Sequence, residues 1–339
     1  MPMSAHNPLP RTLLHNKAER IAREVGFALG REIYRGAYYT PDRVRNIIFE
    51  GTLRGEPALL KLYDDPRITY EPRDQIAFNR INTSTMLVAP KVYRYKILSP
   101  HKGWLIMEKL PEKGRFFSQP VANKKEFAAL YLEYRTHFPL KPTRPLTLAE
   151  RLPADEFHHY RIHRWFELAH AQESARRKAM LDPNAFLPRY AQALKCIRQE
   201  FKTRKMVWCH GHFKPHELYK IHNQNLYYLT DFAHTHLYPE GYEFGFIIWA
   251  DWFMSADWRL PYGKWKKGVD EWMRVLRPVA DTLGIKKYGR LIAASLLERI
   301  LGTILADITA SEKPRKEQEK RVTLLYRLLN DILNIERKW

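Results

Sequence analysis

The spacing of hydrophobic positions changes along the chain from helical to strand-like and back. Over residues 11–29 apolar side chains recur at three- and four-residue steps, which predicts a helix. From about 26 to 110 they form short runs rich in β-branched and aromatic residues, punctuated by glycine and proline, which is typical of strands. The predicted strands are IYRGAYYT, NIIFEGTL, PALLKLYDD, VYRYKILS and GWLIMEKL, and a helix is predicted at 72–86.

After Pro111 the helical spacing returns and dominates the rest of the chain. Helices are predicted at 123–138, 154–180, 184–203, 263–283, 288–309 and 315–335. Within 206–233 the segments MVWCHG, LYKIH and LYYLTDF are predicted to be short strands joined by exposed loops. The pattern therefore predicts an α+β protein with a helical extension at 1–25, a small antiparallel β-rich lobe at 26–110 and a larger, mostly helical lobe at 111–339.

Composition favours a globular protein, and the cytoplasm is the expected compartment. Of the 339 residues 45% are hydrophobic and 13% aromatic, which is enough to build a substantial core. Cys196 and Cys209 are the two cysteines and give no disulfide framework, and the first residues lack the apolar core of a signal peptide. The apolar stretch 291–308 contains Glu298 and Arg299, so a helix with a buried face is expected there and no membrane span.

The formal charge of +20 and a pI near 9.8 make a nucleic-acid partner conceivable. The basic residues are scattered, however, with small clusters at 176–178, 264–267 and 313–321. No zinc finger, RNA-recognition signature or basic zipper accompanies them. A solvated basic surface is the simpler interpretation.

The segment HGHFKPHE (210–217) carries the densest candidate chemistry. His210 and His212 stand two positions apart, so on a strand both rings would point to one face, as in many metal sites. The binuclear hydrolase pattern His-x-His-x-Asp-His would then need Asp and His where the chain has Lys214 and Pro215. A metal-dependent enzyme built on this histidine cluster is kept as an alternative.

The order of several short motifs resembles another kind of site. ALLKLY contains Lys61, LIMEKL ends the next long strand, HGHFKPHE follows far downstream, and LYYLTDF then reaches Asp231. In this order they resemble the aminoglycoside phosphotransferase and choline kinase-like branch of the protein-kinase-like fold, over roughly residues 26–250. The resemblance implies two lobes, bound ATP and Mg²⁺, and phosphoryl transfer to a hydroxyl group of a small-molecule acceptor.

The resemblance also implies roles for individual residues. Lys61 would bind the nucleotide phosphates, because an ammonium in an apolar strand needs an anion. Asp231 would hold Mg²⁺, and His210 would hold the catalytic loop in place by hydrogen bonds. The hinge that contacts adenine would comprise Met107, Glu108 and Leu110.

The chain departs from the family at its two most important loop positions. His212 stands where the catalytic Asp is expected, and Glu217 stands where a metal-binding Asn is expected. A neutral His212 has a suitable pKa for a general base, and Glu217 offers hard oxygens to Mg²⁺. The phosphate-binding loop also departs, since the segment IYRGAYYTPDRV offers only Gly36 before the second strand, and Leu59 would narrow the adenine pocket.

Two supporting residues are less clear-cut in the sequence. The partner of Lys61 is open between Glu71, Asp74 and Gln75, which all lie near the start of the predicted helix. Glu243 is expected to be structural and to bond the backbone of the catalytic loop.

These departures leave a pseudokinase, which binds nucleotide or a partner without turnover, as the main alternative to an active phosphotransferase. The acceptor is expected to meet the helical stretch 147–206, which alternates aromatic residues with His or Arg. An aminoglycoside is an unsuitable acceptor for so basic a protein, because it is itself a polycation.

Overall fold

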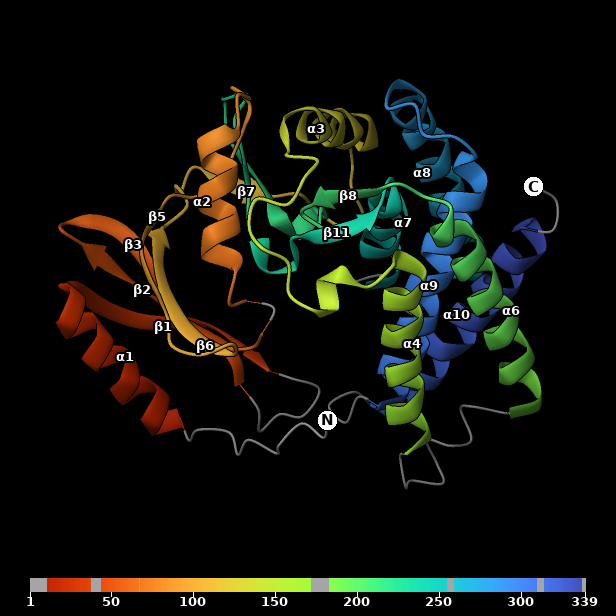
Figure 1. Cartoon of the computed structure of the whole chain (residues 1–339), viewed down its shortest axis with the longest axis horizontal. Helices are drawn as coiled ribbons and strands as arrows, with labels where there is room; N and C mark the ends of the chain where they lie inside the picture. The colour runs from red at the N-terminus through yellow and green to blue at the C-terminus, as the bar shows by residue number, and fades with distance from the viewer. Residues whose placement is uncertain are drawn as a thin grey trace.

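The computed structural model describes residues 11–37, 44–66, 68–171, 183–254, 259–309 and 314–336, and it has the two lobes that the sequence predicts. A β-rich lobe lies at one end of the molecule and a lobe made mostly of helices at the other (Figure 1). Between them lie short strands that carry the candidate site. None of the described helices is long and apolar enough to cross a membrane.

The N-terminal lobe is built on one antiparallel five-stranded sheet with the order β1-β2-β3-β6-β5. Its strands are β1 (Phe27–Ala37), β2 (Val44–Leu53), β3 (Glu56–Asp64), β5 (Val92–Ile97) and β6 (Lys102–Glu108). Side chains alternate across a strand, so Leu60 and Leu62 enter the core on one face while Lys61 and Tyr63 point to the other. This alternation directs the Lys61 ammonium toward the rest of the protein.

Two helices lie on opposite sides of this sheet (Figure 1). α1 (Arg11–Val25) packs Ala18, Ile21 and Ala22 against it, and α2 (Glu71–Ile81) lies between the sheet and the middle of the molecule. Both helices are shorter than predicted. α1 stops because Gly26, at φ +71°, turns the chain into β1, and α2 stops because the chain beyond it extends into β4 (Leu87–Val88).

Two smaller sheets join distant parts of the sequence. One has the order β4-β10-β9-β7, with β7 (Gly114–Phe116), β9 (Leu218–Ile221) and β10 (Tyr227–Leu229). The other pairs β8 (Met206–Cys209) with β11 (His236–Pro239). The sequence pattern did not predict β7 or β11. β4 lies before residue 110 and β10 lies after it, so this sheet crosses the expected lobe boundary. That boundary stays a prediction.

Helices make up most of the C-terminal lobe (Figure 1). They are α3 (Lys124–His137), α4 (Ala154–His170), α6 (Pro183–Lys202), α7 (Tyr242–Trp249), α8 (Tyr262–Thr282), α9 (Tyr288–Thr309) and α10 (Arg315–Glu336). Single turns lie at η1 (Ala149–Arg151), η2 (Pro215–Glu217), η3 (Phe232–His234) and η4 (Ala250–Met254). α4 is shorter than the predicted 154–180, and residues 172–180 of that prediction lie outside the described residues. α9 is buried almost all round because α4, α6, α7 and α10 surround it, which explains its apolar sequence.

An aromatic cluster on α3 packs against the catalytic-type loop, residues 210–217. Phe213 is fully buried, and its ring packs 4.7 Å from Tyr134, 5.3 Å from Tyr131 and 5.4 Å from Phe127, measured between ring centroids. All three partners come from α3. The middle of the loop is therefore anchored in the core, while its flanking residues carry polar groups.

Replacing Phe213 by alanine should lower the free energy of unfolding by about 3–5 kcal/mol, because it leaves a cavity among three aromatic rings. Phe116→Ala is a matched control, since Phe116 is 42% exposed. Urea denaturation of both variants checks the expectation. Equal losses in the two variants would show that the loop is not anchored through Phe213.

Candidate active site

The loop that follows β8 is held in shape by one buried glutamate. Gly211 has a φ of +78°, and a Cβ there would lie 2.5 Å from the carbonyl oxygen of His234, so this position requires glycine. The Gly211 N–H donates to Glu243 at 2.8 Å, and Tyr131 and Tyr134 donate their hydroxyls to the same carboxylate at 3.3 Å. The prediction that Glu243 bonds the loop backbone is confirmed.

His210 ties the start of the loop to the end of β10. Its ring is fully buried, and Nε2 donates to the carbonyl oxygen of Thr230 at 2.9 Å. Its backbone N–H donates to the Tyr134 hydroxyl at 2.6 Å. Burial lowers the pKa of His210 to about 4, so the ring is neutral. These contacts agree with the positioning role that the resemblance implies.

Lys61 forms a buried ion pair with Glu71, at the start of α2. Its Nζ lies 2.9 Å and 2.7 Å from the two carboxylate oxygens, and both side chains are almost completely buried. Burial alone would lower the pKa of Lys61, but Glu71, Asp231 and Glu217 together raise it, so the ammonium stays charged. Glu71 is therefore the partner of Lys61, which the sequence left open.

Asp74, another residue considered as that partner, belongs to a different network. It accepts from Arg144 Nε at 3.1 Å, and Arg144 also binds Glu150 at 2.7 Å and 2.9 Å. The guanidinium lies over the rings of Tyr70 and Trp208, with its Cζ 4.3 Å and 5.1 Å from their centroids. Arg144 therefore fastens α2 to the C-terminal lobe.

Asp231 is a carboxylate that senses the charge of Lys61 without being its ion-pair partner. It sits just before η3 in the left-handed region, with φ 58° and ψ 65°, and its side chain is half-buried. Burial opposes its ionisation, but Lys61 and Lys214 outweigh that effect and lower the pKa of Asp231. Within the described part of the chain Asp231 makes no ion pair closer than 4.0 Å, so its negative charge is available to a ligand.

Glu217, the second predicted metal ligand, already has partners for both oxygens. Lys214 Nζ lies 2.9 Å from Oε1, and the Thr230 hydroxyl donates to Oε2 at 3.0 Å. Burial raises the pKa of Glu217 to about 7, although Lys214 acts in the opposite direction. A metal ion at Glu217 would have to compete with the Lys214 ammonium.

His212 lies between two other rings. Its centroid is 3.3 Å from that of His234 and 4.6 Å from that of Phe246, and both pairs are stacked. Burial, the neighbouring His234 and Lys214 hold the pKa of His212 well below its usual range, so the ring is neutral. Arg299 adds to this effect from the far side of Phe246, with its Cζ 5.4 Å from that ring.

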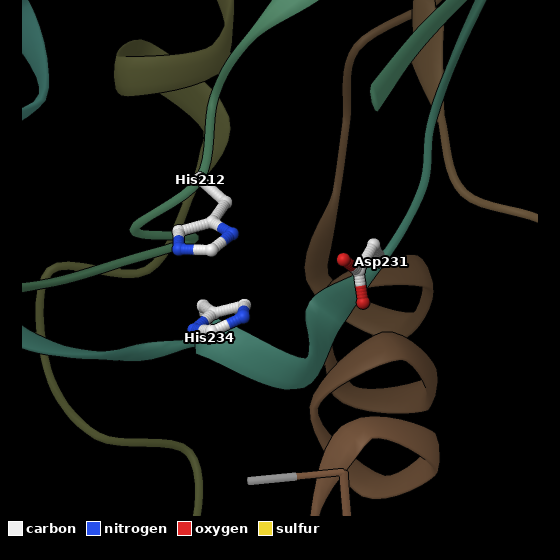
Figure 2. Close-up of side chains that lie close together, drawn as sticks. All are labelled: His212, Asp231 and His234. Carbon is white, nitrogen blue, oxygen red and sulfur yellow. The ribbon is translucent and has the colours of Figure 1, made fainter. Parts of the chain in front are cut away.

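Figure 2 shows that His212 and His234 face Asp231 from one side. One nitrogen of each ring and one carboxylate oxygen lie within 4.8 Å of one another. The histidine cluster expected from the sequence is thus divided, because His216 is exposed and His210 bonds Thr230. The sequence placed His234 among the histidines near this loop but gave it no role of its own, and the single turn η3 after Asp231 brings it onto His212.

The predicted hinge begins in the last two residues of β6, Met107 and Glu108, and continues past its end to Leu110. Met107 pairs with Leu59 on β3, and the Glu108 N–H donates to the Lys91 carbonyl at 2.8 Å. The Glu108 side chain accepts from the Lys91 N–H at 2.9 Å and from the Tyr228 hydroxyl at 3.3 Å. Contact of Met107, Glu108 and Leu110 with adenine stays a prediction, as does the lack of a glycine-rich phosphate loop, because residues 38–43 lie outside the described residues.

Glu217→Gln should gain stability relative to the natural protein as the pH rises from 5 to 7.5. The natural folded state keeps its Glu217 proton up to about pH 7, whereas the unfolded chain releases it near 4.5, so the natural protein loses stability across this window. The glutamine has no proton to lose, and the difference should grow by about 1–3 kcal/mol.

Urea denaturation at the two pH values checks this, with the exposed Glu112→Gln as control. Any constant cost of leaving Lys214 without its partner cancels between the two pH values. A stability difference that does not change with pH would contradict the raised pKa.

Known proteins resemble this chain in structure rather than in sequence. No protein-family model and no curated protein sequence matches it. An ethanolamine kinase from Plasmodium vivax is similar with a TM-score of 0.58 at 15% identity, covering 89% of this chain and 84% of that one. A choline kinase from Streptococcus pneumoniae gives 0.56 at 11% identity, covering 96% and 99%.

A spectinomycin phosphotransferase, solved in complex with ADP and spectinomycin, gives a TM-score of 0.57 at 9% identity and covers 96% of this chain and 98% of that one. Sequence identities this low support a shared fold but not a shared chemistry, which has to be argued from the residues of the site. The similarity nevertheless extends over both lobes and nearly the full length of each chain. The expected architecture is confirmed: the chain has the kinase-like fold shared by aminoglycoside phosphotransferases and choline and ethanolamine kinases.

Proposed function

We propose that the protein is an ATP-dependent phosphotransferase that acts on the hydroxyl group of a small molecule. The observation that carries the proposal is the buried Lys61–Glu71 ion pair next to the anionic Asp231. A buried ammonium is costly unless it is paired, and its second neighbour here is a carboxylate suited to a metal ion. This combination is the one that phosphate groups and their Mg²⁺ ion require.

The charged residues also fit the nucleotide and the ion in kind. Lys61 and Lys214 are buried ammonium groups that can bind phosphate oxygens, and Asp231 offers hard oxygens to Mg²⁺. Glu217 suits the ion less well, because Lys214 and Thr230 occupy its oxygens. When bound, Mg²⁺ would neutralise charge on the transferring phosphoryl group.

His212 is proposed to accept the proton of the attacking hydroxyl. As the new oxygen–phosphorus bond forms and the bond to ADP breaks, the hydroxyl proton would pass to a ring nitrogen of His212. The ring must be neutral to do this, and its lowered pKa keeps it neutral; the same lowering makes His212 a weaker proton acceptor than the unperturbed imidazole that the sequence suggested. His210 and Glu243 act indirectly, by holding the loop in its shape.

The surroundings of His212 disfavour a polycationic acceptor. Arg299, which is ion-paired with Glu298, lies over Phe246 and Trp249, and Phe246 stacks on His212, so a cationic side chain lies near the proposed base. This supports a neutral or anionic acceptor over an aminoglycoside. The buried free thiols of Cys196 and Cys209 support a reducing compartment, which we propose to be the cytoplasm.

A pseudokinase is the second candidate, and one observation favours it. Glu217 is engaged by Lys214 and Thr230, so the loop offers the ion one free carboxylate, Asp231, where active relatives are expected to offer two groups. On this alternative the nucleotide would bind without turnover.

Lys61→Met should abolish stabilisation by ATP and Mg²⁺, because it removes the buried cation that the phosphates would contact. For the natural protein, ATP at a hundred times its dissociation constant should add about 2.7 kcal/mol of stability. A thermal-shift titration checks this, with the exposed Lys91→Met as matched control. An unchanged response in Lys61→Met, or none in the natural protein, would refute nucleotide binding at this site.

His212→Ala should lower kcat by about 10²–10⁴-fold while ATP binding persists, because it removes the proposed proton acceptor. Steady-state kinetics with a screened panel of alcohols, sugars and amino alcohols provides the measurement, and the exposed His216→Ala serves as control. An unchanged rate would rule out His212 as the base. His212→Asp separates the two candidates, because activity that appears only in this variant identifies the natural protein as a pseudokinase.

A further inference from the structure

We infer that His212, His234 and Asp231 form a binding site for one divalent transition-metal ion, of the class of Zn²⁺ or Co²⁺. The three donors come from the catalytic-type loop and from the turn after β10, two segments that β8, β9, β10 and β11 bring together. Their ligand atoms lie within 4.8 Å of one another. This site differs from the Asp231 and Glu217 pair that the resemblance implies for Mg²⁺.

An unsatisfied nitrogen atom points to a ligand here. His212 Nδ1 is buried and has no hydrogen-bond partner among the described residues. A buried polar atom of this kind carries a cost, which a bound ion would remove. In Figure 2 a nitrogen of each imidazole lies on the side facing Asp231.

The close stacking of His212 and His234 limits their charge. The centroids of His212 and His234 lie only 3.3 Å apart, which two protonated rings would not tolerate. Neutral imidazoles are the form that binds metal ions. The structure therefore places two imidazole nitrogens side by side, within 4.8 Å of an Asp231 oxygen.

The balance of charge also favours a cation. Lys61 is ion-paired with Glu71, and the Lys214 ammonium lies 2.9 Å from Glu217, so both cations contact carboxyl groups other than Asp231. Asp231 keeps its negative charge and, within the described ranges, has no ion-pair partner of its own. The Asp231 carboxylate therefore lies near the two imidazole nitrogens without an ion-pair partner among the described residues.

The donor set selects among ions. Two imidazole nitrogens and one carboxylate oxygen suit Zn²⁺, Co²⁺ and similar ions, whereas Mg²⁺ prefers oxygen ligands and retained water. Three protein ligands leave at least one coordination position open, and all three residues are half-buried rather than sealed. A bound ion would occupy a lone pair of His212, so metal binding and proton acceptance by His212 exclude each other.

The test is a titration of tag-free, chelator-treated protein with Zn²⁺ and with Co²⁺, without nucleotide. We expect one equivalent of Zn²⁺ by elemental analysis, and visible Co²⁺ absorption that Zn²⁺ abolishes and excess Mg²⁺ leaves unchanged. His212→Gln, His234→Gln and Asp231→Asn should each weaken binding by at least about 100-fold, since outer-shell partners alone account for 10–100-fold.

His216→Gln is the matched control, because His216 lies in the same loop but is exposed, and it should bind the ions as the natural protein does. The unfolding temperatures of the metal-free variants show which of them fold, and any one folded ligand variant suffices for the comparison. No bound equivalent in the natural protein, or undiminished binding in a folded ligand variant, would overturn the site. The assay contains no nucleotide, so it leaves nucleotide binding untested, whereas a bound ion at His212 would exclude His212 as the proton acceptor.

Discussion

Charge pairing in a region with little water is the constraint on which the site depends. The buried Lys61 ammonium on β3 is tolerated only because an anion contacts it. Glu71 supplies that anion from the first turn of α2. The pair fixes α2 against the sheet. A second pair, Lys214 with Glu217, closes the loop on itself in the same way. Removing one member of either pair would leave a buried charge that the surrounding side chains cannot solvate.

The fold could be predicted from the sequence wherever a local pattern was strong. The apolar run around Lys61 located the strand β3, and helical spacing located α9 and α10 closely. The short strands β7 and β11 were missed because their formation depends on partners distant in the sequence, which no local pattern reveals. The ends of α1 and α2 were placed too late because glycine and the start of a strand stop them.

The site shows the same division between local and distant information. The motif order was sufficient to connect Lys61, the histidine loop and Asp231. Helix geometry, and not sequence distance, decided that Glu71 is the partner of Lys61. The sequence placed His234 near the loop histidines, but only the folded turn after Asp231 shows that it stacks on His212. A family resemblance points to the positions of the family's motifs. It does not point to a group of residues that includes a departure from those motifs, such as His212.

The four-stranded sheet has a consequence for how the protein is made on the ribosome. β4 pairs in parallel with β10, so Leu87 meets Tyr227 although most of the C-terminal lobe's first half separates them in the sequence. Until β10 has emerged, the segment after α2 has no strand to pair with, and the small sheet that supports the loop cannot close. The β-rich lobe is therefore translated well before β10, the strand that pairs with β4. Its assembly is coupled to the later half of the chain, and a truncated product would expose an unpaired strand edge.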